Sequence, residues 1–376
     1  MTRRERLLAT LRGEPVDRPA VSFYEIGGFA VDPTDPDPFN IYNSPSWQPL
    51  LQLAEEQTDL IRMRAPTVRR SVVNPQTEFW RTEEFEKDGS RFKRTTVQIA
   101  GRTMTALMRR DPEVDTIWNL EHLLKDEDDL HAYLELPEDA ALPDVDVAPL
   151  LAEDQALGDR GIIMVDTPDP LCIAAGLFSM EDYTVLAFTQ RALFHRLLEK
   201  LAHQLYAQTE IIAREFPGHL WRIYGPEYAT EPYLPPELFA EYVVRYTGPM
   251  VYQIQRHGGF ARIHSHGRIR NVLPLIRQMG ASAIDPIEPP PQGNITLAEV
   301  RRNYGNDFVL FGNIEIADIE NLPPERFEKV VAQSIRDGTA GLGRGFVLMP
   351  SAAPYGRVIT PQTMANYETM VRLVNQ

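Results

Sequence analysis

Eight short apolar runs recur along this chain, and their spacing constrains the fold more than any other feature of the sequence. Each is five or six residues long, and they lie at 20–24, 59–63, 161–166, 220–224, 260–265, 283–287, 308–312 and 345–349. Stretches with helical periodicity separate most of them, at 181–215, 236–257, 268–279, 295–303 and 324–337. Strands that alternate with helices pair in parallel through right-handed crossovers.

This alternation predicts an α/β protein, a single (β/α)8 barrel spanning residues 1–376, with a doubly wound open sheet as the competing architecture. No Gly-x-Gly-x-x-Gly pattern follows an early strand, and the glycines of 341–345 precede the last one. The barrel is therefore favoured. At the start of the chain, Thr2 and Glu5 form a capping-box pattern that predicts a helix over residues 3–12.

The interval 64–160 is too long for one crossover. Within it, residues 77–86 and 91–99 flank an Asp88-Gly89 turn and predict a β-hairpin. Residues 121–139 are acidic and have a helical pattern. We interpret 64–160 as an insertion over the C-terminal mouth of the barrel, without a core of its own.

Charge and cysteine content narrow the range of partners. The chain carries 38 basic and 53 acidic residues, a net charge of −15, which repels nucleic-acid backbones and anionic lipid. No apolar run approaches the length of a membrane span, and the N-terminus lacks the apolar core of a signal peptide, so we expect a cytoplasmic protein. The single cysteine, Cys172, excludes internal disulfides, so a metal would need His, Asp or Glu ligands.

Polar residues stand at almost every predicted strand end. In barrels of this kind the chemistry lies at the C-terminal ends of the strands. The candidates at these ends are Tyr24, Glu25, Arg64, Asp166, Glu227, His264, His266, Glu288, Asn313 and Tyr355. Such clustering is what a substrate site requires, although each residue taken alone has the alternative of being a surface or capping group.

The tetrapeptide from His264 to Gly267 is the most informative of these ends. Residues i and i+2 of a strand share one face, so His264 and His266 can point at one spot. Two imidazoles there, with Glu227 as third ligand, suit Zn²⁺. Glu227 could instead be a general base or a loop carboxylate, and the histidines could be a core residue and a helix cap. Asp166 ends an otherwise apolar run, so its carboxylate needs a partner.

Several segments resemble the uroporphyrinogen decarboxylase superfamily. They are residues 4–19 (Arg-Glu-Arg-Leu-Leu-Ala-Thr-Leu-Arg-Gly-Glu-Pro-Val-Asp-Arg-Pro), residues 264–286, Gly312-Asn313-Ile314 and Gly345-Phe346-Val347-Leu348. They occur in the same order as in the superfamily and cover almost the whole chain. The resemblance implies a single (β/α)8 barrel.

The resemblance also separates two chemistries. Decarboxylases of this superfamily carry an arginine-rich segment after the first strand and a histidine after the last, whereas this chain has 24–29 (YEIGGF) and 349–355 (MPSAAPY) there. Thiol-using cobalamin-dependent methyltransferases bind zinc through an H-x-C-G element and a later cysteine. Here His264 matches the first ligand, but His266 replaces the first cysteine and Ser351 stands at the place of the second.

The resemblance therefore points to the methyltransferase-like branch. It implies an enzyme that moves a methyl group from a small O- or N-methylated substrate to a corrinoid protein. We predict catalytic roles for Asp166, Glu227, His264 and His266, and substrate contacts for Tyr24, Glu25, Arg64, Glu288, Asn313 and Tyr355. One alternative is a decarboxylase or other lyase that uses Arg62, Arg64 and Arg357 to bind an acidic molecule. The other is a barrel that only binds a ligand.

Overall fold

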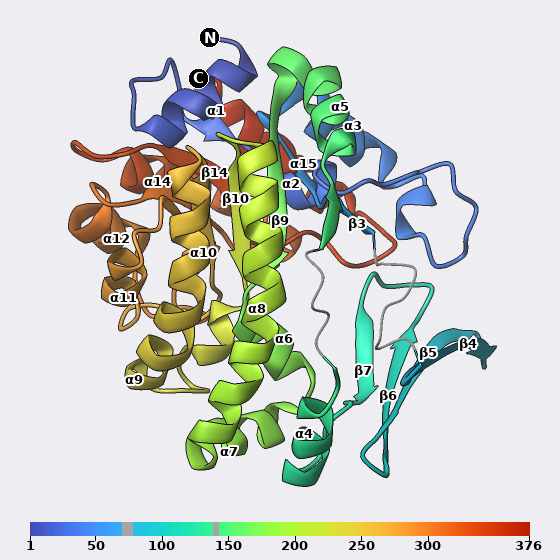
Figure 1. Cartoon of the computed structure of the whole chain (residues 1–376). Coiled ribbons are helices and arrows are strands. Elements are labelled where there is room, and N and C mark those ends of the chain that lie inside the picture. The colour runs from blue at the N-terminus through green and yellow to red at the C-terminus, as the bar shows by residue number, and fades with distance from the viewer. Residues whose placement is uncertain (70–77, 138–142) are drawn as a thin grey trace.

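Eight parallel strands form one curled sheet in the computed structural model, which describes residues 1–69, 78–137 and 143–376 (Figure 1). The strands are β1 (Ala20–Val21), β2 (Leu60–Arg64), β9 (Gly161–Pro168), β10 (Leu220–Tyr224), β11 (Phe260–His264), β12 (Ala283–Asp285), β13 (Val309–Ile314) and β14 (Phe346–Pro350). Their order is β1-β14-β13-β12-β11-β10-β9-β2. The predicted (β/α)8 barrel is confirmed, and each predicted apolar run overlaps a strand of the sheet.

The two ends of this order, β1 and β2, are joined by Asp59. Its backbone N–H donates to the Val21 carbonyl at 2.7 Å, and its side chain accepts the Val21 N–H at 2.9 Å. Arg6 and Arg18 also donate to this fully buried carboxylate, at 2.6 and 2.8 Å. A buried carboxylate needs such donors, so the sheet closes around one hydrogen-bonded aspartate.

Helices follow most strands and cover the outside of the barrel. They are α1 (Arg3–Arg12), α2 (Tyr24–Gly27), α3 (Gln48–Gln57), α6 (Pro170–Gly176), α7 (Met180–Thr189), α8 (Arg191–Glu215), α9 (Pro236–Phe239), α10 (Arg245–Arg256), α11 (Leu273–Gln278), α12 (Leu297–Tyr304), α13 (Ile316–Asn321), α14 (Pro324–Thr339) and α15 (Pro361–Val374). The Thr2 and Glu5 capping box is present at α1, as predicted. Figure 1 shows α8 and α10 side by side along β10.

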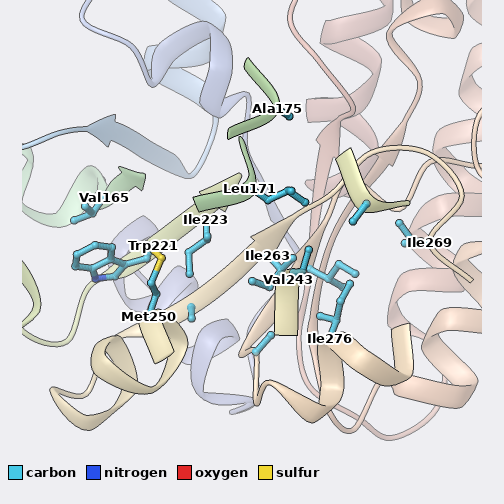
Figure 2. Packing of buried hydrophobic residues seen from close by; sticks show 14 of the residues in the cluster. Val165, Leu171, Ala175, Trp221, Ile223, Val243, Met250, Ile263, Ile269 and Ile276 are labelled. Carbon is cyan, nitrogen blue, oxygen red and sulfur yellow. The ribbon is translucent and has the colours of Figure 1, made fainter. Parts of the chain in front are cut away.

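The strands separate two hydrophobic clusters. Outward residues such as Trp221, Ile223 and Ile263 pack against the surrounding helices, for example against Met250 of α10 (Figure 2). Inward residues form a second cluster that includes Leu7 of α1 and fills the lower barrel. Its other strand members are Ala20, Ile61, Met63, Ile162, Met164, Leu220, Ala283, Val309, Phe311, Val347 and Met349. Because side chains alternate along a strand, this cluster identifies which residues face the interior.

The insertion is larger than the predicted hairpin. β4 (Trp80–Lys87) and β5 (Ser90–Ile99) form that hairpin, but β6 (Arg102–Arg110) and β7 (Ile117–Glu121) extend it to a four-stranded antiparallel sheet. β3 (Thr67–Arg69) pairs with β8 (Asp144–Asp146), so the insertion leaves and rejoins the barrel at one place. In the described part of the acidic stretch, 121–137, the helix is limited to the short α4 (Glu127–Leu134), and α5 (Ala148–Leu157) leads into β9. Residue 77 of the predicted hairpin and 138–139 of the predicted helix lie outside the described residues.

The insertion contacts loops at the C-terminal side of the barrel. The Asp115 N–H donates to the Tyr355 carbonyl at 2.8 Å, beyond β14, and Arg91 pairs with Asp37, beyond β1, at 2.9 Å. Leu124 N–H donates to a carbonyl in the loop after α6 at 2.8 Å. That the insertion covers the mouth stays a prediction.

No single helix in the described ranges is long and apolar enough to cross a membrane; α6 and α7 pass that test only as a pair bent by 120°.

Candidate active site

A layer of charged residues lies in the barrel above the inward apolar cluster. On β10 and β11 the inward positions after Leu220 and Phe260 are Arg222 and Arg262, which are opposite each other in the register. Asp166 of β9 is opposite Arg222 on the other side. Three neighbouring strands thus contribute one carboxylate and two guanidinium groups at the same height in the barrel.

Both arginines of this layer are ion-paired. Arg222 Nη1 donates to Asp166 Oδ1 at 2.9 Å, and Arg262 Nε lies 3.1 Å from Asp285 Oδ1 at the end of β12. Arg262 and Asp285 are fully buried, whereas the side chains of Arg222 and Asp166 retain 12% and 22% exposure. Burial raises the pKa of Asp166, and the Arg222 charge opposes this rise. The Arg222–Asp166 pair is therefore the less buried part of the layer.

Tyr24 covers both guanidinium groups. The centre of its ring lies 4.7 Å from the Arg262 guanidinium and 5.9 Å from that of Arg222, and Phe311 faces Arg262 at 4.9 Å. Such cation–π contacts stabilise a charge that has lost its water. Tyr24 is buried, its hydroxyl donates to Glu25 at 2.9 Å, and burial raises its pKa well above the ordinary value.

His264 ends β11 inside the same layer. Its Nδ1 lies 2.7 Å from Asp285 Oδ2, and both side chains are buried. Burial lowers the pKa of His264 to about 3 against the attraction of Asp285. Burial would raise the pKa of Asp285, but the charges of Arg262 and His264 bring it down to about 2. At neutral pH His264 is therefore a neutral imidazole that donates through Nδ1–H to an ionised carboxylate.

His266 sits just above, at the rim of the mouth. Its ring centre lies 4.7 Å from that of His264, edge to face, and its Nδ1 lies 2.8 Å from Glu288 Oε1. The second oxygen of Glu288 accepts the Gly267 N–H at 2.6 Å, which fixes the carboxylate. Burial would lower the pKa of His266, but the hydrogen bond and charge of Glu288 raise it. Its side chain is 36% exposed, so His266 can exchange protons with a ligand in the mouth.

Two more carboxylates near this rim have raised pKa values. Glu227 follows β10, accepts the Gly225 N–H at 3.0 Å, and has a raised pKa because of its burial. Glu315 follows β13, accepts the Ser351 hydroxyl at 3.3 Å, and burial together with the Glu288 charge raises its pKa to about 7. Both groups can therefore carry a proton closer to neutral pH than an ordinary glutamate.

The arginines predicted to bind a substrate carboxylate lie elsewhere. Ile61 and Met63 are the inward residues of β2, so Arg62 and Arg64 point outward. Arg64 pairs with Glu153 of α5, and Arg62 pairs with Glu55 of α3. Counting strand ends ignored this parity, and a substrate contact for Arg64 stays a prediction.

Arg357 is held at the insertion. Its Nε donates to the Pro112 carbonyl at 3.1 Å, and its Nη1 donates to Asn43 at 2.9 Å. The lyase alternative thus loses the three cations on which it was based.

Three further predicted contacts are tied to other partners. Asn313 accepts the Ser334 hydroxyl of α14 at 3.0 Å, on the outer side of the barrel. Tyr355 is 56% exposed in the loop that contacts the insertion. Glu25 accepts the Ala353 N–H at 2.8 Å besides the Tyr24 hydroxyl, so it holds the loop after β14. Substrate contacts for Asn313, Tyr355 and Glu25 therefore stay predictions.

The predicted zinc ligands do not assemble into a site. Among residues 1–69, 78–137 and 143–376, no three His, Cys, Asp or Glu side chains are placed to hold a metal ion. His264 and His266 do have the Nδ1–carboxylate contacts that often orient metal-binding imidazoles, but Glu227 does not complete a triad with them. The residues present thus do not fit a three-ligand zinc site, and the same contacts suit proton transfer.

Strand parity could have found the residues that sequence reasoning missed. Arg222, Arg262 and Asp285 are charged residues inside apolar runs, and their parity with inward neighbours places them in the barrel. They pass unnoticed when only the residue at each strand end is considered. Their partners could not be inferred, because a register between strands is a tertiary property.

A cavity of about 470 Å³ opens beside the charged layer, between α8, the end of β9 and the insertion. Asp166 lies in its wall together with Trp80 of β4 and Tyr133 of α4. The wall facing α8 includes Lys200, His203, Gln204 and Gln208. Asp166 also accepts a hydrogen bond from Arg222 in the barrel, so it belongs both to the cavity wall and to the candidate site.

Fold and site together define a (β/α)8 barrel with ionisable groups gathered at the C-terminal ends of its strands. The family profile described as "Uroporphyrinogen decarboxylase (URO-D)" matches residues 119–376, more than half of the chain. The chain therefore belongs to the uroporphyrinogen decarboxylase family, as the resemblance of its motifs indicated. No curated protein matches the sequence.

Solved structures are similar to this chain at low sequence identity. A methyltransferase from Methanosarcina mazei is similar over 100% of this chain and 98% of its own, with 15% identity and a TM-score of 0.62. A D-psicose 3-epimerase solved in the presence of D-fructose has 10% identity, coverage of 61% and 82%, and a TM-score of 0.33. A Bacteroides ovatus GH5 xyloglucanase has 10% identity, coverage of 83% and 94%, and a TM-score of 0.33. The first of these shows a shared fold over the full length.

Proposed function

We propose that this protein is a methyltransferase that moves a methyl group from a small O- or N-methylated substrate to a corrinoid carried by a partner protein. The charge balance of the mouth is the observation that carries this proposal. Arg222 and Arg262 are each paired with one aspartate, Asp166 and Asp285, and the neighbouring strand ends carry four more carboxylates: Glu25, Glu227, Glu288 and Glu315. Such a mouth suits a neutral or cationic substrate and disfavours a polyanion. The family and the methyltransferase fold neighbour agree with the general kind of enzyme.

The heteroatom that loses its methyl group must be neutralised as the bond to carbon breaks. His266 suits this task because Glu288 fixes its Nδ1–H and raises its pKa. Protonated His266 would donate its Nε2 proton to an ether oxygen, which leaves as an alcohol. His264, buried and neutral, would keep the rim imidazole in place through their edge-to-face contact.

The remaining rim groups would position the substrate. Asp166 and Glu227 would attract a methylammonium group, and the raised pKa of Glu227 allows it to relay a proton to His266. When bound, the corrinoid supplies the nucleophile that accepts the methyl group. The chain itself contributes binding, orientation and the proton.

The test is an anaerobic assay of the purified protein with a reduced corrinoid protein and a panel of methyl ethers and methylamines. The demethylated product is quantified by mass spectrometry. We expect at least one compound to be demethylated, and a loss of about 10²–10⁴-fold in rate for His266→Ala. If no panel member is demethylated by wild-type protein in any corrinoid context, the proposal is wrong.

Decarboxylation of an acidic molecule is the second candidate, since Arg222 and Arg262 are cations inside the barrel and the family description names that reaction. For uroporphyrinogen itself we expect no conversion at ordinary enzymatic rates of about 1 s⁻¹ or faster, because the carboxylate-rich mouth would repel its many acid groups. The measurement is coproporphyrinogen formation in an anaerobic assay.

A further inference from the structure

The charged layer contains guanidinium nitrogens that no described residue satisfies. Arg262 is fully buried, yet its Nε and Nη2 have no hydrogen-bond acceptor within the described ranges, and neither has the buried Nε of Arg222. The ion pair of Arg262 with Asp285 brings the charges to 3.1 Å without a well-directed hydrogen bond. Buried donors are nearly always satisfied in folded proteins, so these nitrogens indicate that an acceptor from outside the chain belongs here.

Aromatic rings occupy the space beside both guanidinium groups, and only Arg222 of the two retains exposure through which an acceptor could reach it. Aromatic rings lie against the flat faces, with Tyr24 and Phe311 against Arg262 and Tyr224 at 5.0 Å from Arg222. Carboxylates meet a guanidinium edge-on, through two parallel hydrogen bonds. Arg222 uses Nη1 for Asp166 and has 12% of its side chain exposed, so a ligand from the mouth would meet it first.

The layer and the rim differ in their balance of charged groups. The floor offers two guanidinium groups, whose charges Asp166 and Asp285 balance. The rim above carries the carboxylates Glu227, Glu288 and Glu315, and the imidazole of His266 is paired with Glu288. A ligand with a negative end below and a positive end above would match both levels.

We propose that the mouth binds a small zwitterion, an N-methylated amino acid whose carboxylate lies on the edge of Arg222 above Arg262 and whose methylammonium group lies among the rim carboxylates. That this ligand is also the methyl donor rests on the proposed function. The binding itself needs no corrinoid and no methyl transfer.

Isothermal titration calorimetry of the full-length protein, without corrinoid, measures how much each charged end of the ligand contributes to its affinity. The probes are N,N-dimethylglycine, which carries both charges, N,N-dimethylethanolamine, which lacks the carboxylate, and methoxyacetate, which lacks the cation. We expect dimethylglycine to bind at least tenfold more tightly than either of the others, a difference of about 1.4 kcal/mol. Equal affinities for dimethylglycine and dimethylethanolamine, or no binding of dimethylglycine, would overturn the proposal.

Variants then test Arg222 directly. Arg222→Lys keeps the charge but loses the two-pronged geometry, and Asp166→Asn combined with Arg222→Gln replaces the ion pair by two neutral amides. We expect at least a tenfold loss of dimethylglycine affinity in both, with melting temperature measured to verify folding. Arg277→Gln, which alters an exposed arginine beside Asp307, is the matched control and should bind as wild type does. Wild-type affinity in a folded double variant would contradict the proposal, whereas tight binding without methyl transfer would contradict only the proposed function.

Discussion

His264 and His266 both direct Nδ1 at a carboxylate, yet their surroundings give them opposite acid–base behaviour. The His264–Asp285 pair is buried, and the pKa of its imidazole falls to about 3. The His266–Glu288 pair lies at the rim with the imidazole 36% exposed, and its pKa rises. The same two functional groups thus become a fixed neutral scaffold in one place and a proton donor in the other, because removal of water penalises the imidazolium form.

Among the variants that test this comparison, Asp285→Ala should cause the largest loss of unfolding free energy. The change leaves Arg262 buried without its counter-ion and His264 without its acceptor. Breaking one side of a buried ion pair costs about 3–5 kcal/mol of unfolding free energy, which urea denaturation would measure. Asp307→Ala removes an exposed carboxylate 3.7 Å from Arg277 and should change stability by less than about 0.5 kcal/mol. Similar losses of unfolding free energy in both variants would show that the buried ion pair contributes no more to stability than the exposed one.

His266→Ala should separate catalysis from stability. Given the proposed function, the demethylation rate should fall by about 10²–10⁴-fold. The free energy of unfolding should change by less than about 1 kcal/mol, because the side chain is partly exposed and outside the apolar clusters. If the variant loses stability and keeps its activity, His266 has a structural role like that of His264 and is not the proton donor.

The two histidines should respond to pH in opposite directions. The folded pKa of His266 lies above its unfolded value of 6.5, so its stabilising contribution is complete below pH 6.5 and is lost as pH rises through the folded pKa. The folded pKa of His264 is about 3, so the unfolded chain takes up a proton first and stability falls as pH drops from 6.5 towards 3. NMR titration of the imidazole nuclei would measure both, and Glu288→Gln should lower the pKa of His266 while that of His264 stays low.

Tyr355→Phe should have the smallest effect of these variants, and it is measured on kcat/KM. Tyr355 is 56% exposed, and the hydrogen bond from the Asp115 N–H goes to its backbone carbonyl. We expect the kcat/KM for the methylated substrate to stay within about twofold of wild type, a change below about 0.5 kcal/mol. A large loss would return Tyr355 to the substrate site, where strand-end counting had placed it.

Strand-end counting selected some residues that the structure brings together and others that it does not, for one physical reason. His264 ends β11 on the parity of Arg262, and His266 follows two residues beyond the strand with its ring centre 4.7 Å from that of His264, so the two imidazoles do come together. Arg64 ends β2 on the outward parity and bonds α5 instead. Asn313 follows an inward Phe311 by two residues but bonds α14, so regular alternation has stopped by the end of β13.

The sequence by itself determined the barrel. Eight apolar runs with helical intervals leave few other ways to bury their side chains, and every run overlaps a strand of the sheet. The capping box at Thr2 and the Asp88-Gly89 turn are equally local, because each depends on residues close together in the chain. The sheet made by β4 to β7 was only half recognised, since β6 and β7 have no comparably strong turn signal between them.

Only the tertiary structure decided how the ionisable groups combine. Asp166, Arg222 and Arg262 become neighbours through the register of three strands, and Asp285 reaches both Arg262 and His264 from a fourth. Their pKa values follow from burial and from these contacts, which couple residues tens of positions apart in the chain. Electrostatic interactions depend on distance and on exclusion of water, and neither quantity is present in the order of amino acids until the barrel has closed.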